Sequence, residues 1–128
     1  MTEMYFQEAA AWVLTAITCG TNVEIGGVAK AINPDHLTPI EPMFAGEVAL
    51  AAAGQKMTRK QAGDIVKELL PKYEDKIKGD PALTIGKKYQ ELYNMDSLTP
   101  CSEYVDLYQQ MKKEIGKLGV KFQYNYLK

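Results

Sequence analysis

Apolar and polar residues alternate along this chain in a way that predicts a mainly helical protein. Thr2 can cap a first helix over residues 3 to 18, and Gly20 can adopt the left-handed conformation that ends it. Apolar side chains surround this segment on almost every side, which predicts a helix that is buried all round. We therefore expect its covering layers to come from a larger structure or from another subunit.

A capping signature begins the second predicted helix, over residues 39 to 53. Thr38 can cap it, Pro39 suits the first helical position, and Glu41 stands where a capping-box acid bonds back to the cap. Many alanines follow, and their small side chains let this helix approach a neighbour closely. Glu47 lies six residues after Glu41, on roughly the opposite face, so the two carboxylates do not form an obvious acid and base pair.

The second half of the chain predicts three more helices. Thr58 and Gln61 repeat the capping box, and the amphipathic pattern that follows should bend or break at Pro71. A two-turn helix is expected over residues 87 to 93, and Thr99 with Pro100 opens the last long helix. The apolar seam of that helix consists of Tyr104, Tyr108, Met111, Ile115 and Leu118.

One short strand is predicted at residues 22 to 28, where Val23 and Ile25 alternate with polar residues ahead of two glycines. A single strand leaves its backbone groups without partners. The only other segment with strand character is 120 to 122. We therefore expect the partner strand to come from another chain or from another part of a longer protein.

Composition then narrows the classes of function. The chain has 128 residues, with 15 basic against 16 acidic side chains, and no basic patch that would bind nucleic acid. Its two cysteines are far apart, so neither a disulfide framework nor a zinc site is indicated. The apolar run from Ala9 to Ile17 is too short to span a membrane, and no export signal is evident. We expect a soluble protein of the cytoplasm.

The sequence contains no complete catalytic or metal-binding set of residues. His36 is the only histidine, and in its Pro-Asp-His loop we expect a surface turn residue and not a base or ligand. Cys19 and Cys101 lack a basic neighbour, which favours buried structural thiols over nucleophiles. The residue pattern alone therefore indicates a helical segment suited to interactions, with no catalytic residue.

Several short motifs, taken in order, add a family resemblance. They are Thr2-Glu3-Met4, Gly46-Glu47-Val48-Ala49, Ala53-Gly54, Gln90-Glu91, Tyr93, Thr99-Pro100, Glu103-Tyr104, Tyr108 and Leu118-Gly119. Together they resemble the C-terminal portion of the monomethylamine corrinoid protein methyltransferases. That family has a (β/α)8 barrel fold and moves a methyl group from monomethylamine to the cobalt of a separate corrinoid protein.

The resemblance implies a specific organisation. Residues 1–57 would be the last helix, strand and helix of the barrel, and 58–128 a helical C-terminal extension, in one unit. The family's catalytic residues would lie upstream, so none is carried over. The loop before residue 39 would lie at the barrel mouth, where active sites of barrels are found. Asp35, His36 and Glu41 thus become candidates for lining a corrinoid site, and no cofactor or metal is expected to bind the chain directly.

A second hypothesis from another class remains open. The chain could be a small helical module that associates with itself or with a protein partner through its first and last helices. Both hypotheses predict contacts with another protein surface, either the remainder of a barrel or a second copy of the chain. An independent enzyme that uses His36 or a cysteine is a distant third.

Overall fold

The computed structural model describes residues 2–23, 34–79 and 86–127. Within these ranges the order of elements is α1 (Glu3–Thr18), the short 3-10 helix η1 (Pro34–His36), α2 (Ile40–Gly54), α3 (Arg59–Lys78), α5 (Tyr89–Leu92), β1 (Tyr93–Asn94), β2 (Thr99–Pro100) and α6 (Ser102–Lys117). The predicted mainly α class is confirmed, and α1, α2 and α3 begin close to their predicted starts. Thr99 and Pro100, predicted to open the last long helix, instead form β2, and α6 begins at Ser102.

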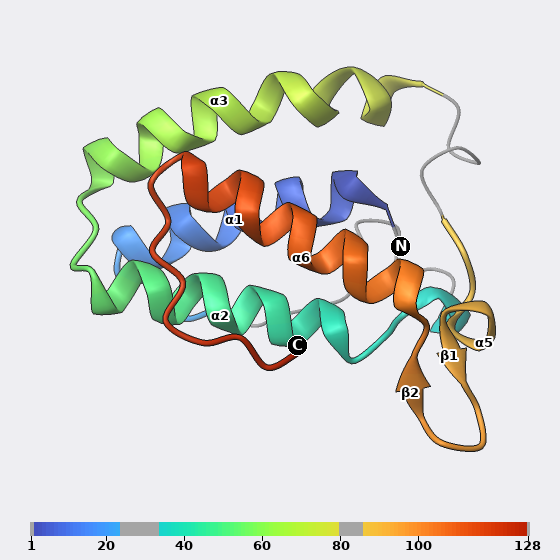
Figure 1. The fold of residues 1–128 in the computed structure, drawn as a ribbon. Coiled ribbons are helices and arrows are strands. Elements are labelled where there is room, and N and C mark those ends of the chain that lie inside the picture. The colour runs from blue at the N-terminus through green and yellow to red at the C-terminus, as the bar shows by residue number, and fades with distance from the viewer. Residues whose placement is uncertain (1, 24–33, 80–85, 128) are drawn as a thin grey trace.

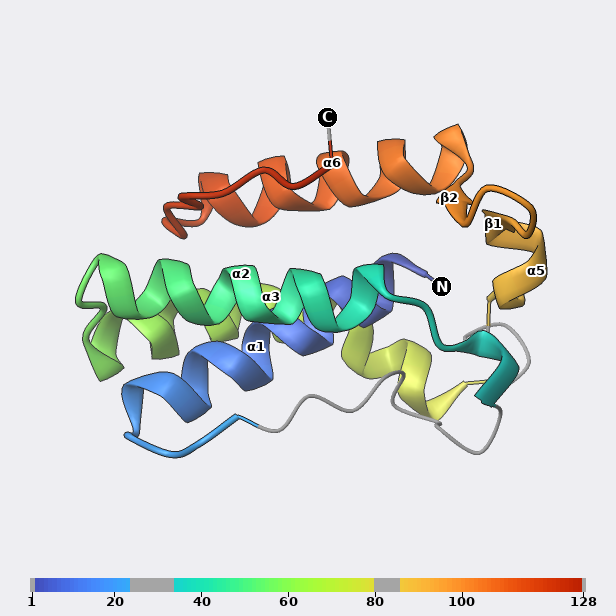
Figure 2. The ribbon, with the colours of Figure 1, turned by 90° about the horizontal axis from the view of Figure 1, so that it is seen from below.

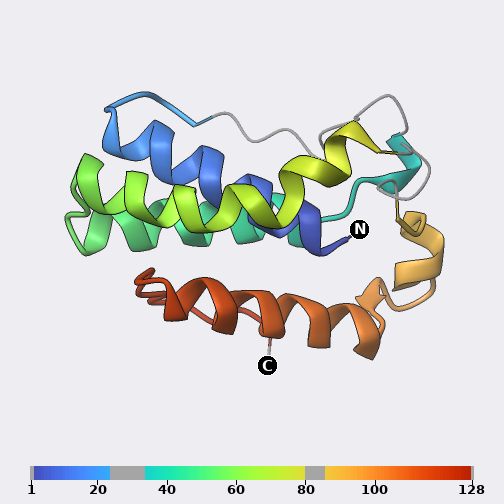
Figure 3. The same cartoon turned by 90° about the horizontal axis from the view of Figure 1, so that it is seen from above.

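The four long helices pack around one apolar core. In Figure 1, α2 and α3 form the two sides, α1 lies between them at the back, and α6 crosses in front. Figures 2 and 3 show the same arrangement from below and above, with α6 on the opposite side of α2 from α1. The start of α2, the start of α6 and the β1–β2 hairpin share one end of the bundle (Figure 1).

Aromatic rings join three of these helices at the centre of the core. Phe6 of α1 meets Phe44 of α2 edge to face, with ring centroids 4.8 Å apart. Tyr108 of α6 lies 6.5 Å from Phe6 and 6.4 Å from Phe44. All three side chains are fully buried. Such edge-to-face contacts fix the distances between helices in addition to burying apolar area.

Helix α1 is covered mostly from within the chain, which corrects the prediction that its covering layers come from elsewhere. It packs against α2, α3 and α6. The helix is also not buried all round, because Trp12 is 47% exposed and Thr15 beside it is exposed. The prediction was wrong because a long run of apolar residues does not show which of its large side chains lie at the protein surface.

Helix α3 begins at the predicted capping box. The Thr58 hydroxyl accepts a hydrogen bond from the backbone N–H of Gln61 at 3.2 Å, and Gln61 Oε1 accepts one from the Thr58 N–H at 2.9 Å. The two side chains thereby satisfy two of the backbone donors that every helix start leaves without partners.

Replacing Thr58 with alanine should therefore cost about 1 kcal/mol of unfolding free energy, the usual effect of losing an N-cap side chain. Urea denaturation followed by circular dichroism measures it. Ser102→Ala is the matched control, because the structure gives no side-chain hydrogen bond for this exposed residue at the start of α6. Equal stabilities of the two variants would contradict the role of the capping box.

Of the bend or break predicted at Pro71, the break does not occur, and the helix continues past it, as residues 72 to 77 allowed. The helix runs without interruption from Arg59 to Lys78 with Pro71 inside it. Pro71 removes the hydrogen bond that the carbonyl of Lys67 would otherwise receive. Both residues are exposed, so water can hydrogen-bond to that carbonyl and the helix continues.

The strands differ from the prediction. Most of the predicted strand at 22–28 lies outside the described residues, and Asn22 and Val23 are irregular. Residues 120–122 do not form a strand either. Instead Tyr93 pairs antiparallel with Pro100 and Asn94 with Thr99. The loop between them is fixed by the Asn94 side chain, whose oxygen accepts hydrogen bonds from the N–H groups of Asp96 and Ser97.

Candidate functional site

The three residues expected at a barrel mouth lie together in sequence but differ in exposure. Asp35 is exposed, whereas His36 is only 8% exposed and Glu41 is fully buried. The expectation that His36 is a surface residue is therefore wrong. No hydrogen bond or ion pair joins these three side chains in the part of the chain that the structure describes.

Glu41 is held at the start of α2 by a partial capping box. Its Oε2 accepts a hydrogen bond from the backbone N–H of Thr38 at 2.8 Å. The Thr38 hydroxyl does not cap the helix; it bonds to the hydroxyl of Tyr104 on α6 at 2.6 Å. Glu41 thus has the predicted role of bonding back to the start of the helix, while Thr38 links α2 to α6.

The second carboxyl oxygen of Glu41 lies in an environment that favours the protonated form of the side chain. Oε1 is buried and has no hydrogen-bond partner among the described residues. Burial raises the pKa of the carboxyl from 4.5 to about 7, although the Thr38 N–H acts in the opposite direction. Near neutral pH a substantial fraction of Glu41 is therefore protonated, and it can donate or accept a proton.

Three tyrosines from different elements surround this carboxyl. Burial, and after it the charge of Glu41, raises the pKa of Tyr5 on α1. Burial raises the pKa of Tyr104 above its ordinary range, and that of Tyr93 on β1 to about 12. Tyr93 and Tyr104 pack edge to face, with centroids 6.2 Å apart. The tyrosines therefore remain protonated and provide a weakly polar enclosure in which Glu41 is poorly solvated.

A second buried polar cluster lies one turn further along α6. The Tyr108 hydroxyl lies 2.7 Å from each carboxylate oxygen of Glu47, and Lys112 Nζ lies 3.0 Å from Glu47 Oε2. The same ammonium donates to the Tyr108 hydroxyl at 3.1 Å and to the backbone carbonyl of Tyr124 at 2.7 Å. Every charged group in this cluster has partners, which is typical of a structural link between α2, α6 and the C-terminal segment.

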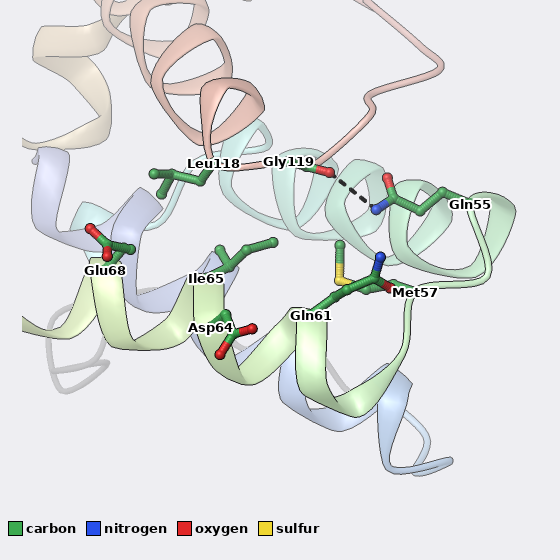
Figure 4. Close-up of a pocket in the computed structure, with 8 residues that line it drawn as sticks. All are labelled: Gln55, Met57, Gln61, Asp64, Ile65, Glu68, Leu118 and Gly119. Atoms are coloured by element: carbon green, nitrogen blue, oxygen red, sulfur yellow. Dashed lines mark hydrogen bonds between the residues drawn. The ribbon is translucent and has the colours of Figure 1, made fainter.

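An open groove of about 310 Å³ lies between the start of α3 and the end of α6. Figure 4 shows its lining residues: Gln55, Met57, Gln61, Asp64, Ile65, Glu68, Leu118 and Gly119. Gln55 donates to the carbonyl of Gly119 at 3.1 Å, and Asp64 pairs with Lys60 at 3.0 Å. The groove contains none of the predicted site residues, and the polar side chains of Gln55, Gln61 and Asp64 already have partners within the protein.

Other kinds of site receive no support within residues 2–23, 34–79 and 86–127. No group of three or more His, Cys, Asp and Glu side chains could hold a metal ion there, and no helix is long and apolar enough to cross a membrane. Cys19 is exposed and Cys101 is partly exposed, so the prediction of buried thiols is wrong. Neither thiol is disulfide-bonded.

Sequence reasoning missed most of the residues around Glu41. The spacing of Tyr104 and Tyr108 did predict a buried seam on the last helix. Nothing in that spacing identified Thr38 as the partner of Tyr104, because 66 residues separate them. The partner of Tyr108, Glu47, is 61 residues away. Local periodicity shows that a face is buried, but it does not show what the face contacts.

Comparisons with known proteins identify the family. The model of the family described as "Monomethylamine methyltransferase MtmB" matches residues 1–120. The chain is 35% identical over 123 residues to monomethylamine methyltransferase MtmB2 of Methanosarcina acetivorans. It is 34% identical to MtmB of Methanosarcina mazei and to MtmB1 of Methanosarcina barkeri. Each match covers 94% of this chain.

The chain matches only a part of each of these relatives. The chain spans 26% of the length of each of them. No solved structure matches the chain. Because the family model covers 120 of the 128 residues, the chain belongs to the monomethylamine methyltransferase MtmB family.

Proposed function

We propose that this chain is the C-terminal part of an enzyme that moves a methyl group from monomethylamine to a corrinoid protein, and that it is not catalytic in isolation. The observation that carries this proposal is the family match over residues 1–120, combined with a coverage of only 26% of the relatives' length. The motifs noted in the sequence resemble, in their order, those of the C-terminal portion of that family.

The described residues do not fit a corrinoid held by this chain itself. His36 is the only histidine in the sequence, and its ring is buried, so it is not presented as a ligand for a cobalt ion outside the chain. The corrinoid therefore belongs to a partner protein in this proposal. Asp35 has the exposed side chain that could face such a partner, whereas Glu41 would hold the start of α2 in place beneath it.

The test is a chimera of the full family length. This chain replaces the matching quarter of MtmB2 from Methanosarcina acetivorans, and methyl transfer from monomethylamine to a corrinoid protein is measured. We expect transfer by the chimera and none by the 128-residue chain alone. The relative without its matching quarter serves as the negative control. Turnover by the isolated chain, or a chimera without activity, would contradict the proposal.

Self-association of the chain is the second candidate function. It is favoured by two large apolar side chains at the surface, Trp12 of α1 and Leu50 of α2, each 47% exposed. Sedimentation equilibrium of the isolated chain tests it directly. A dimer at micromolar concentration, together with an inactive chimera, would favour this alternative.

A further inference from the structure

Helix α2 differs from an ordinary surface helix because its charged residues lie on the buried side and its exposed side carries no charge. Its two charged residues, Glu41 and Glu47, are buried. Apart from Gly54 at the end of the helix, the positions left exposed or partly exposed are the following, and none carries a charge: Pro42, Met43, Gly46, Ala49, Leu50 and Ala53. We call these six residues the α2 outer face. An amphipathic helix on a protein surface normally shows the opposite distribution.

The spacing makes the α2 outer face one continuous stripe. Its members recur three or four residues apart along the helix, so they share one side of it. Within the described residues, the other long helices place charges on their exposed sides. Helix α3 exposes lysines and acids throughout, α6 exposes Glu103, Asp106 and Lys113, and α1 exposes Glu3. Among these four helices, α2 alone presents an uncharged outer side.

The surface over this stripe is open at its centre. A side chain added at Gly46 would meet no atom within 4 Å. Met43 and Ala49 are partly buried against the core on either side of it, and Leu50 projects with about half of its surface exposed. Small residues beside two larger apolar side chains allow another backbone to approach closely. An apolar surface of this kind is typical of a protein contact.

We propose that the α2 outer face packs against the part of the methyltransferase that lies outside these 128 residues. This inference rests on the proposed function. The relatives are about four times as long as this chain, since it spans 26% of their length. A C-terminal quarter must contact the remainder somewhere, and the one uncharged helix side is the surface best suited to lasting burial. That contact also explains why α2 directs both of its carboxylates inward, toward the tyrosines of α6.

The test compares two leucines on different helices. Leu50→Glu places a charge on the α2 outer face. Leu70→Glu places the same charge on the charged side of α3, where Leu70 is 38% exposed. Both substitutions are introduced into the chimera described above and into the 128-residue chain. The soluble yield and the rate of methyl transfer are measured for the chimeras, and the urea midpoint for the isolated chains.

We expect Leu50→Glu to lower the yield or activity of the chimera by at least about tenfold, because an unpaired charge would be buried at the contact. Leu70→Glu should change it by less than about twofold, as is usual for surface substitutions. Neither substitution should shift the urea midpoint of the isolated chain. These results together would support the proposed contact.

Three other results would overturn it. If both substitutions leave the chimera equally active, the proposed function stands but the α2 outer face is not the contact. If Leu50→Glu leaves the chimera unchanged and abolishes a dimer of the isolated chain, the face contacts a second copy instead. If the unsubstituted chimera is inactive, the proposed function fails, and this inference fails with it.

Discussion

Replacing Lys112 with methionine should destabilise the fold by about 3 kcal/mol or more, because breaking a buried ion pair leaves one charge without compensation. Lys112 and Glu47 are 7% and 1% exposed at their side chains, with Nζ and Oε2 3.0 Å apart. The ammonium also holds the carbonyl of Tyr124, so the C-terminal segment should detach from the bundle in this variant. Urea denaturation measures the loss of stability.

Lys113 provides the control for this experiment. It neighbours Lys112 on the same helix but is exposed, so Lys113→Met should change the free energy of unfolding by less than about 0.5 kcal/mol. The double variant Glu47→Gln with Lys112→Met should recover part of the lost stability, because no uncompensated charge remains. Similar stabilities for the Lys112 and Lys113 variants would show that the buried ion pair contributes little.

The limits of helices follow local rules, which explains why they could be predicted from the sequence. Caps and apolar periodicity at residues 3 to 18 predicted α1 at its observed bounds, and Thr58 with Gln61 predicted the start of α3. The hairpin at Tyr93 to Pro100 was missed because strands of two residues have no periodicity to detect. Its signal was the polar turn at Asn94, whose side chain accepts two backbone hydrogen bonds.

The orientation of helices was harder to predict than their existence. Helix α2 is apolar nearly all round, so its pattern does not show which side faces the core. The structure places Glu47 inside and Leu50 outside, because Tyr108 and Lys112 of α6 supply partners for the carboxylate. Those partners lie more than 60 residues away in sequence. Burial of Glu41 and His36 likewise depends on contacts that the residue pattern does not record.

Replacing Glu41 with glutamine should change how stability depends on pH. The folded-state pKa of Glu41 is raised to about 7 from an ordinary value of 4.5, mainly by burial. Between pH 4.5 and about 7 the folded protein therefore binds more protons at this group than the unfolded chain does, so its stability falls as pH rises. We compare Glu41 with a carboxyl whose pKa is the same in the folded and unfolded states. Relative to that carboxyl, Glu41 leaves the free energy of unfolding nearly unchanged below pH 4.5 and lowers it by about 3 kcal/mol at pH 8.

Glutamine is neutral at every pH, has nearly the same shape, and can still accept the hydrogen bond from the Thr38 N–H. The Gln variant should therefore exceed the wild-type protein in stability by about 3 kcal/mol at pH 8, and the difference should shrink to near zero at pH 4.5. Urea unfolding of both proteins at several pH values measures it. Glu68→Gln, a change at an exposed site on α3, should give no such trend. A difference between Glu41→Gln and wild type that stays constant with pH would mean that the Glu41 carboxyl keeps an ordinary pKa. In that case solvent or a hydrogen-bond donor would have to reach Oε1 in the folded protein.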